Sequence, residues 1–337
     1  MRVPKQLNWE EKEFDAEVLD WIAQQNLWNL WVPKTYGGLE MTLPEGLVKL
    51  RSLAQMDGSL GWTVTLCSGA NFFIGNLQKE VADEIFHNPE RPVCFGGSGG
   101  VFGTAEKQGE GYIISGIWKY ATGAPYLTHF TLNAKIQKGG KDVLQADGTP
   151  TVRSFVLGKD DVEIIKDWNT MGLKATATHS FRIDSKWVHG KYSFVYNELY
   201  QPHTIFKVPF SVFADLTLWA NYIGMAWHFL EEGRKVLRTH KSLTELENTI
   251  KSSDKLMMDY AGQIQGQIGK SATFSETFIK KVHRKASESV MSLSHAIIEA
   301  YPILGIYASK EAHRLNQIFK DYFTATQHHI FREGTQS

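Results

Sequence analysis

A cluster of glycines is the first feature of the sequence that could bind a ligand. Residues 95–103 read Phe-Gly-Gly-Ser-Gly-Gly-Val-Phe-Gly and continue the apolar run that begins at residue 93. A dinucleotide-binding turn would need a helix directly after it, and a P-loop would need Gly-Lys followed by Ser or Thr. Residues 103–111 have the composition of turns and a strand, so neither site is predicted. We expect a flexible loop at a sheet edge, in which glycines would let backbone amides approach a flat or anionic ligand closely.

The second candidate is the polar face of a helix predicted near the C-terminus. At about 100° per residue, residues 315–330 separate into an apolar stripe and an opposite polar face. The stripe consists of Leu315, Ile318, Phe319, Tyr322, Phe323 and Ile330, and the polar face of Gln317, Asp321, Thr324 and His328. Such a face usually meets solvent; alternatively it lines a polar cavity or contacts another subunit. His328 and His329 would point about 100° apart on a helix and cannot share a metal ion, and no other metal-binding spacing occurs.

The composition narrows the class of protein. The 337 residues contain 36 Lys and Arg and 36 Asp and Glu, so the basic excess of a general nucleic-acid binder is absent. Two cysteines, Cys67 and Cys94, cannot build a disulfide framework and are typical of a reducing cytoplasm. The apolar run 208–230 is long enough to span a bilayer but contains Asp215, which favours a buried bundle helix. We therefore expect a cytoplasmic protein without a membrane segment or a nucleic-acid partner.

The elements that must position the candidate residues follow a helix–sheet–helix order. Residues 1–90 carry apolar residues at helical spacing, interrupted at Pro33 and at 37–38. Residues 91–195 contain short β-type runs between glycines, of which 129–136 alternates apolar and polar residues. Residues 196–337 return to helical patterns. The fold class predicted is α+β multidomain, with an N-terminal helical domain, a middle antiparallel β-barrel or sandwich and a C-terminal four-helix bundle.

Five segments, in order, resemble motifs of the acyl-CoA dehydrogenase superfamily. The longest is 103–123, in which Gly-Thr-Ala is followed by Gly-Tyr-Ile-Ile-Ser-Gly-Ile-Trp-Lys-Tyr-Ala-Thr-Gly. The others are 32–38, 57–62, 167–178 and 317–328. The resemblance covers nearly the whole chain and implies the acyl-CoA dehydrogenase fold, with a flavin, FAD or FMN, held between the β domain and the C-terminal helices.

The same resemblance implies a set of flavin-binding residues. Those expected beside the isoalloxazine are Trp118, Tyr120, Thr122 and Gly123, and the neighbouring strand would add Thr176 and Thr178. The first β-strand loop would touch flavin and substrate through Phe95, Gly96 and Ser98. Gln317 replaces the arginine that the family uses for the flavin pyrophosphate, and Lys320 replaces its next arginine. Alternatively, these threonine and tyrosine residues only build the strands, because Thr and Tyr are favoured in β-sheets.

The reaction implied depends on which side chain acts as acid or base. An acyl-CoA dehydrogenase needs a carboxylate base, and Glu333 follows Asp321 by more residues than the family spacing. The other family position holds Thr217, two residues after Asp215. The tail, with Asp321 and then Gln-His at 327–328, resembles the two-component flavin monooxygenases better. In that branch His328 would be the acid/base group, and Asp321 is the other catalytic residue expected on this helix. Otherwise His328 is a surface histidine near the C-terminus.

Three functions follow from these patterns. The main interpretation is a flavin-dependent oxidoreductase of the superfamily, of the monooxygenase type, acting on a small or aromatic substrate with reduced flavin from a flavin reductase. The second is an acyl-CoA dehydrogenase that oxidises the Cα–Cβ bond of an acyl-CoA. The third is a non-catalytic relative with a degenerate flavin site. The resemblance also implies a homotetramer or homodimer.

Overall fold

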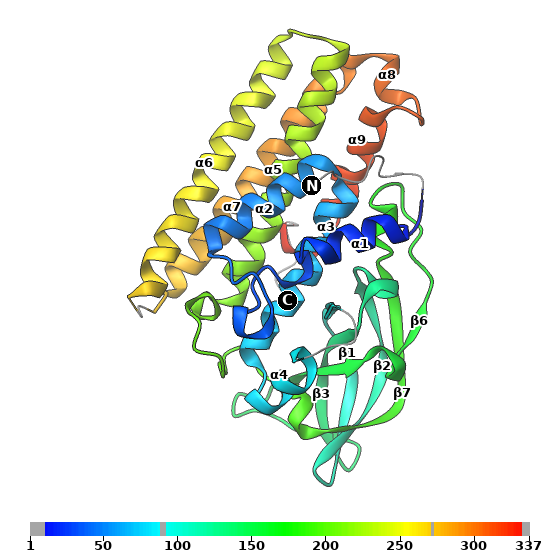
Figure 1. Cartoon of the computed structure of the whole chain (residues 1–337), viewed down its shortest axis with the longest axis vertical. Coiled ribbons are helices and arrows are strands. Elements are labelled where there is room, and N and C mark those ends of the chain that lie inside the picture. Colours follow the sequence, from blue (N-terminus) through cyan, green and yellow to red (C-terminus); the bar gives the residue numbers. More distant parts are fainter. Residues whose placement is uncertain (1–10, 88–91, 271–272, 332–337) are drawn as a thin grey trace.

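The computed structural model describes residues 11–87, 92–270 and 273–331, and Figure 1 shows helices above a twisted sheet. The N-terminal part contains α1 (Ala16–Gln24), α2 (Leu43–Met56), α3 (Gly58–Asn71) and α4 (Lys79–Phe86). Thr42 and Glu45 form a capping box at the start of α2. The carboxylate of Asp57 accepts a 3.0 Å hydrogen bond from Leu60 N at the start of α3. Helix α3 packs directly against strand β1 (Phe95–Gln108).

The middle part is one eight-stranded sheet in the order β6-β7-β2-β1-β3-β5-β8, with β4 paired to β3. After β1 come β2 (Gly111–Ala121), β3 (His129–Lys138), β4 (Lys141–Asp142), β5 (Val152–Gly158), β6 (Glu163–Ile165), β7 (His179–His189) and β8 (Ser193–Phe194). The pair β1–β3 is parallel and the others are antiparallel, so the sheet is mixed rather than wholly antiparallel. The predicted α+β class and the helix–sheet–helix order are confirmed.

The glycine cluster lies inside β1, so the expected loop at residues 95–103 is wrong. Parallel pairing with β3 holds this segment, and two register shifts, after Ser98 and after Val101, bend it. A Cβ at Gly97 would lie less than 3.0 Å from the backbone of Thr131 on β3. Close approach of two strands therefore requires glycine there.

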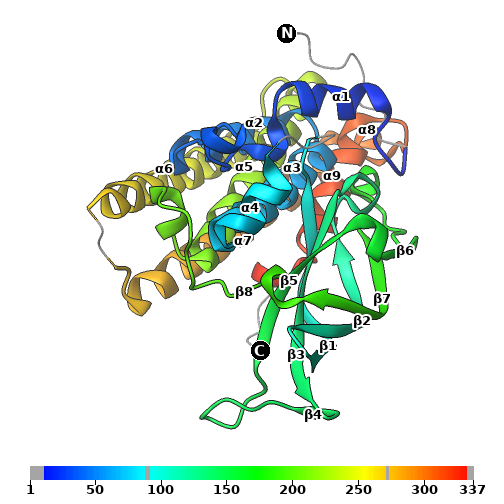
Figure 2. The ribbon, with the colours of Figure 1, turned by 60° about the horizontal axis from the view of Figure 1, so that its bottom comes forward.

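The C-terminal part is a bundle of α5 (Phe210–Val236), α6 (Lys241–Gly269), α7 (Glu276–Ala300), the short α8 (Ile306–Ser309) and α9 (Arg314–Ala325). Helix α5, which contains most of the apolar run 208–230, is packed against α2, α6, α7 and α9. No helix in the described part of the chain is long and apolar enough to cross a membrane. Helix α9 ends at Ala325, five residues earlier than expected, so His328 lies in the turn after it. Figure 2 shows this end of the chain close to the sheet.

Candidate functional site

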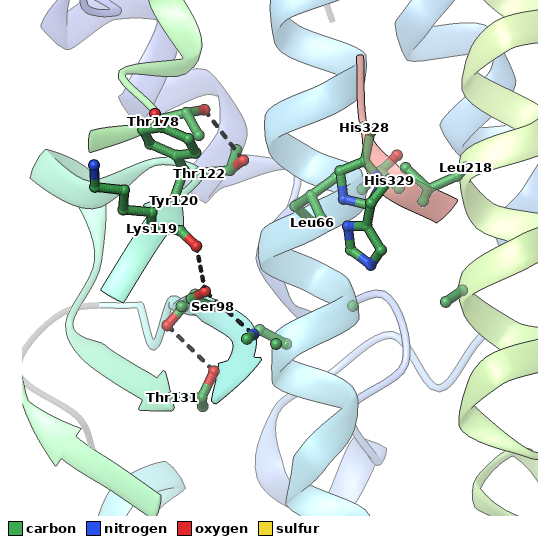
Figure 3. Close-up of a pocket in the computed structure, with 18 of the residues that line it drawn as sticks. Leu66, Ser98, Lys119, Tyr120, Thr122, Thr131, Thr178, Leu218, His328 and His329 are labelled. Atoms are coloured by element: carbon green, nitrogen blue, oxygen red, sulfur yellow. Dashed lines mark hydrogen bonds between the residues drawn. The ribbon is translucent and has the colours of Figure 1, made fainter. Parts of the chain in front are cut away.

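A cavity of about 1070 Å³ lies between the sheet and the helices. Figure 3 shows its two walls: Ser98, Lys119, Tyr120, Thr122 and Thr178 come from the sheet side, opposite Leu66, Leu218, His328 and His329 from the helical side. The volume is slightly above the range of ordinary small-molecule and cofactor sites, which enclose roughly 300–1,000 Å³. The cavity therefore has room for more than one small molecule.

The sheet wall offers an aromatic ring and a chain of hydroxyls. Tyr120 is 49% exposed, and its ring meets Trp168 edge-on at 5.8 Å between centroids. Thr178 Oγ1 donates to Thr122 Oγ1 at 3.2 Å and lies 2.7 Å from Thr176 Oγ1. Ser98 Oγ donates to the carbonyl of Lys119 at 2.6 Å, which joins β1 to β2 along this wall. Such a surface can stack on a flat ring and hydrogen-bond its edge.

Four glycines of β1 also line this wall, and one of them keeps space open. A Cβ at Gly96, Gly97 or Gly100 would lie less than 3.0 Å from Leu127, Thr131 or Phe102 respectively, so protein packing explains those three. A Cβ at Gly99 would meet nothing within 4 Å. Protein packing therefore does not explain the glycine at position 99, and the missing side chain leaves space open in the cavity.

The helical wall presents His328 and Thr324. The His328 ring is half-buried and meets Trp62 edge-on at 5.6 Å. Burial, with a smaller effect of His329, lowers the pKa of His328 to about 4, so its imidazole is neutral at pH 7. Its Nδ1 accepts a long 3.4 Å bond from Ile330 N, which favours the tautomer with the proton on Nε2. Thr324 Oγ1 is buried on the same wall without a hydrogen-bond partner in the described structure, and a ligand would supply one.

Asp321 does not line the cavity, contrary to its expected catalytic place. Its side chain is 3% exposed, and its Oδ1 accepts from Leu173 N at 2.5 Å and from Gln317 Nε2 at 2.7 Å. Leu173 belongs to the segment between β6 and β7, so this carboxyl ties α9 to the sheet. The side chain of Lys320 is also absent from the lining, and its backbone packs against Gly172 of that segment. Asp321 and Lys320 therefore lie at the junction between the sheet and the helical bundle, not at the cavity.

Four of the flavin-site candidates lie behind the sheet wall rather than on it. Trp118 is fully buried, stacks on Phe181 and donates from Nε1 to the carbonyl of Asn133 at 2.8 Å. A register shift between Trp118 and Ala121 breaks the strand alternation, so Trp118 and Tyr120 do not share a face. The other three are Phe95, Gly123 and Thr176, whose backbones are tied to Asn71 and to each other.

Neither of the two carboxylates considered as the base of a dehydrogenase is found at the cavity in the described structure. Glu333 lies outside the described residues. Asp215 does not line the cavity, and its Oδ1 is 3.0 Å from His283 Nδ1 on α7. Thr217, at the neighbouring family position, does line the cavity, and its hydroxyl donates to Phe213 O at 2.9 Å. Within the described ranges no Asp or Glu reaches the cavity, and its strongly basic or imidazole side chains are Lys119, His328 and His329.

Sequence patterns missed a second lobe of the cavity. Phe73, Phe194, Tyr196, Phe210 and Phe213 line one end of it, which we call the aromatic lobe. Asn133 and Ser154 line the adjoining strands. These residues come from five separate segments, and each segment has only the aromatic or polar content of ordinary core, so no local signal distinguishes them.

The buried carboxyl of Asp321 predicts a pH effect on stability. Burial and the nearby negative charge of Asp57 raise its pKa from 3.8 to about 8. The folded protein therefore keeps a proton that the unfolded chain releases, and the free energy of unfolding should fall as pH rises between these values. Asp321→Asn stays neutral and should reduce this decline in melting temperatures measured from pH 5 to 8. Asp20→Asn, on the exposed face of α1, is the control; a slope identical to wild type in Asp321→Asn would contradict the assignment.

The fold and these walls define a protein with the acyl-CoA dehydrogenase fold. XiaF from Streptomyces sp., solved with FADH2 and glycerol, superposes with a TM-score of 0.86 at 18% identity, covering 96% of this chain and 86% of that one. Butyryl-CoA dehydrogenase from Megasphaera elsdenii superposes with a TM-score of 0.77 at 14% identity, covering 94% and 87%. At these identities the likeness concerns the fold.

Curated relatives are flavin-dependent monooxygenases. Indole-3-acetate monooxygenase of Acinetobacter baumannii is 28% identical over 236 residues, 68% of this chain and 57% of that protein. The oxygenase subunit HsaA of a flavin-dependent monooxygenase from Rhodococcus jostii is 21% identical over 229 residues, 64% and 58%. The matched part of the chain thus spans little more than half the length of these relatives. No family model matches the chain.

Proposed function

We propose that the chain is a flavin-dependent oxidoreductase of the monooxygenase type that acts on a small or aromatic substrate. One observation carries the proposal: the neutral His328 faces the Tyr120–Thr122–Thr178 wall across a cavity into which no Asp or Glu of the described chain projects. An acyl-CoA dehydrogenase would need a carboxylate base in that space. The curated relatives support the same class of enzyme.

The cavity suits a flavin, FAD or FMN. Tyr120 would stack on the flavin ring system or meet it edge-on, and the hydroxyls of Thr122 and Thr178 would hydrogen-bond it. The open space at Gly99 would let the ring lie close to β1, beside Gly96 and Ser98. A reduced flavin supplies, when bound, the two electrons with which one atom of O2 enters a substrate and the other leaves as water. The side chains of this protein would bind and orient the ring and exclude water.

His328 is proposed as the group that handles the proton. With its proton on Nε2, the neutral ring can donate to an oxygen atom held in the cavity, and Nδ1 can accept a proton in exchange. Thr324, one helical turn earlier on the same wall, would donate a further hydrogen bond to the bound molecule. Trp62 packs against the imidazole, and together with the apolar walls it would shield this transfer from water once a ligand fills the cavity.

The proposal extends to partners. A separate flavin reductase would supply the reduced flavin, as the words "oxygenase subunit" in the name of the Rhodococcus jostii relative suggest. We also propose a homotetramer or homodimer and a cytoplasmic location, on the resemblance and on the cysteine usage. Size-exclusion chromatography with light scattering tests the oligomeric state.

Reduced flavin is expected to stabilise the protein and to be required for turnover. At a hundredfold excess over Kd it should raise the free energy of unfolding by about 2.7 kcal/mol. The measurement is anaerobic melting with and without photoreduced FMN or FAD, followed by product analysis with indole-3-acetate, O2 and an unrelated NADH-dependent flavin reductase. Samples without added flavin and samples of boiled protein are the controls. Bleaching of bound flavin by an acyl-CoA would favour the dehydrogenase alternative, and absence of any flavin-dependent stabilisation would favour a non-catalytic relative.

A further inference from the structure

The aromatic lobe and the polar side chains beside it have no role in the flavin site described above. Building on the proposed function, we propose that this end of the cavity is a subsite for an aromatic ring that carries an oxygen acceptor, such as a carboxylate or carbonyl, and that the hydroxyl of Tyr196 is the donor that recognises this oxygen. Tyr196 would thereby determine which substrates are held against the flavin-facing wall.

A hydrogen-bond network fixes the polar side chains of this subsite. Ser154 Oγ donates to Asn133 Oδ1 at 2.6 Å, and Asn133 Nδ2 donates to the carbonyl of Gly99 at 2.8 Å. The backbone carbonyl of Asn133 is held from beneath by Trp118 Nε1. Asn133 and Ser154 are 8% and 6% exposed, and both line the cavity. The network is therefore rigid, and its side-chain donors are engaged within the protein.

Among the polar side chains of this group, Tyr196 has a hydroxyl with long contacts to Asn133. These contacts, to Oδ1 and Nδ2, are both 3.4 Å long, and Ser154 is a further hydrogen-bond partner. Both distances are beyond the usual range for a strong hydrogen bond. Burial raises the pKa of the phenol, so it carries its proton at neutral pH. A half-buried hydroxyl with weak internal partners can donate to a ligand oxygen without breaking a good bond.

The rings around Tyr196 create the aromatic part of the subsite. Phe73 stacks on Tyr196 at 4.9 Å with an interplanar angle of 9°, and Phe210 lies 5.1 Å away at 47°. Phe194 and Phe213, both almost fully buried, close the lobe. An apolar, ring-lined surface with one polar donor favours a flat apolar ligand with one polar end.

The sheet order separates this subsite from the flavin-facing wall. Tyr120 and Thr122 belong to β2 and its end, whereas Ser154 belongs to β5, three strands away in the order β2-β1-β3-β5. At about 4.8 Å between neighbouring strands, Ser154 lies roughly 14 Å across the sheet from β2, and Asn133 on β3, which Tyr196 contacts, lies roughly 10 Å from β2. Together with the cavity volume, this spacing leaves room for a substrate beside a flavin ring.

The test uses Tyr196→Phe, with Tyr200→Phe as the matched control because Tyr200 is exposed and outside the cavity. Binding is measured by calorimetry for two probe pairs: indole-3-acetate with 3-methylindole, and p-hydroxyphenylacetate with p-cresol. We expect Tyr196→Phe to weaken binding of the acid in at least one pair by about tenfold. Binding of its apolar partner and of FMN should stay within about twofold, and Tyr200→Phe should match wild type.

Three outcomes would overturn this inference. They are equal losses for both members of a pair, a loss of FMN affinity in Tyr196→Phe, or binding of neither member of either pair by the wild type. A loss of FMN affinity would assign the aromatic lobe to the flavin instead. The proposed function fails separately, if reduced flavin does not stabilise the wild type; if flavin binds and the acids are unaffected by Tyr196→Phe, only the subsite is wrong.

Discussion

Replacing His328 with alanine is expected to lower product formation by about 10²–10⁴-fold while leaving flavin affinity within about twofold. The imidazole sits on the helical wall, opposite the proposed flavin contacts, so its removal eliminates proton transfer without removing a flavin-binding group. Because burial lowers its pKa to about 4, the wild-type rate controlled by this group should be constant above about pH 6 and fall as pH drops through 4.

The measurement is single-turnover product formation with prereduced flavin, together with flavin binding followed by fluorescence. His295→Ala is the matched control, because His295 is exposed on the outer face of α7 and does not line the cavity. Retention of full activity in His328→Ala would contradict the assignment and leave His329, its neighbour on the cavity, as the alternative.

Gly172→Ala is expected to cost about 3 kcal/mol of stability and to reduce activity as well. A Cβ at Gly172 would lie less than 3.0 Å from the backbone of Lys320 and Asp321, and backbone atoms of a helix cannot move aside cheaply. Relief of the clash would push α9 away from the segment between β6 and β7. It would also weaken the hydrogen bond from Leu173 N to Asp321 and displace the turn that carries His328.

Chemical denaturation monitored by tryptophan fluorescence measures this loss. Gly158→Ala is the control, because Gly158 also belongs to the sheet region but a Cβ there would meet nothing within 4 Å. If the two variants were equally stable, the tight junction between α9 and the sheet would not exist in solution. If Gly172→Ala lost stability but retained full activity, the position of His328 would not depend on this junction.

Much of the fold could be predicted from local patterns. Helical spacing with the breaks at Pro33 and 37–38 marks the N-terminal helices, and alternation at 129–136 marks β3, because both patterns reflect burial of one face of a single element. The glycine cluster misled for a related reason: a run of glycines has no side-chain periodicity. Only its pairing with β3, thirty residues away, makes it a strand.

The candidate site divides along the same line. His328, Tyr120, Thr122 and Thr178 stand in motifs whose order and spacing are contained in the sequence, and their side chains do meet at one cavity together with Ser98 of the glycine cluster. Other residues of the same motifs, such as Trp118, Gly123 and Thr176, do not line this cavity. The motif at 103–123 cannot reveal that a register shift buries Trp118 and exposes Tyr120, because the shift arises from pairing with β7.

The order of elements and the types of side chain available for redox and proton chemistry were thus determined by the sequence alone, since they depend on neighbours along the chain. The tertiary structure decided that Asp321 is buried outside the cavity lining, where it accepts a hydrogen bond from Leu173 N. It also decided that Phe73, Asn133, Ser154, Tyr196 and Phe210 share one end of the cavity. The burial of a side chain, its pKa and its contacts with residues distant in sequence depend on long-range packing, and no local pattern of residues encodes these properties.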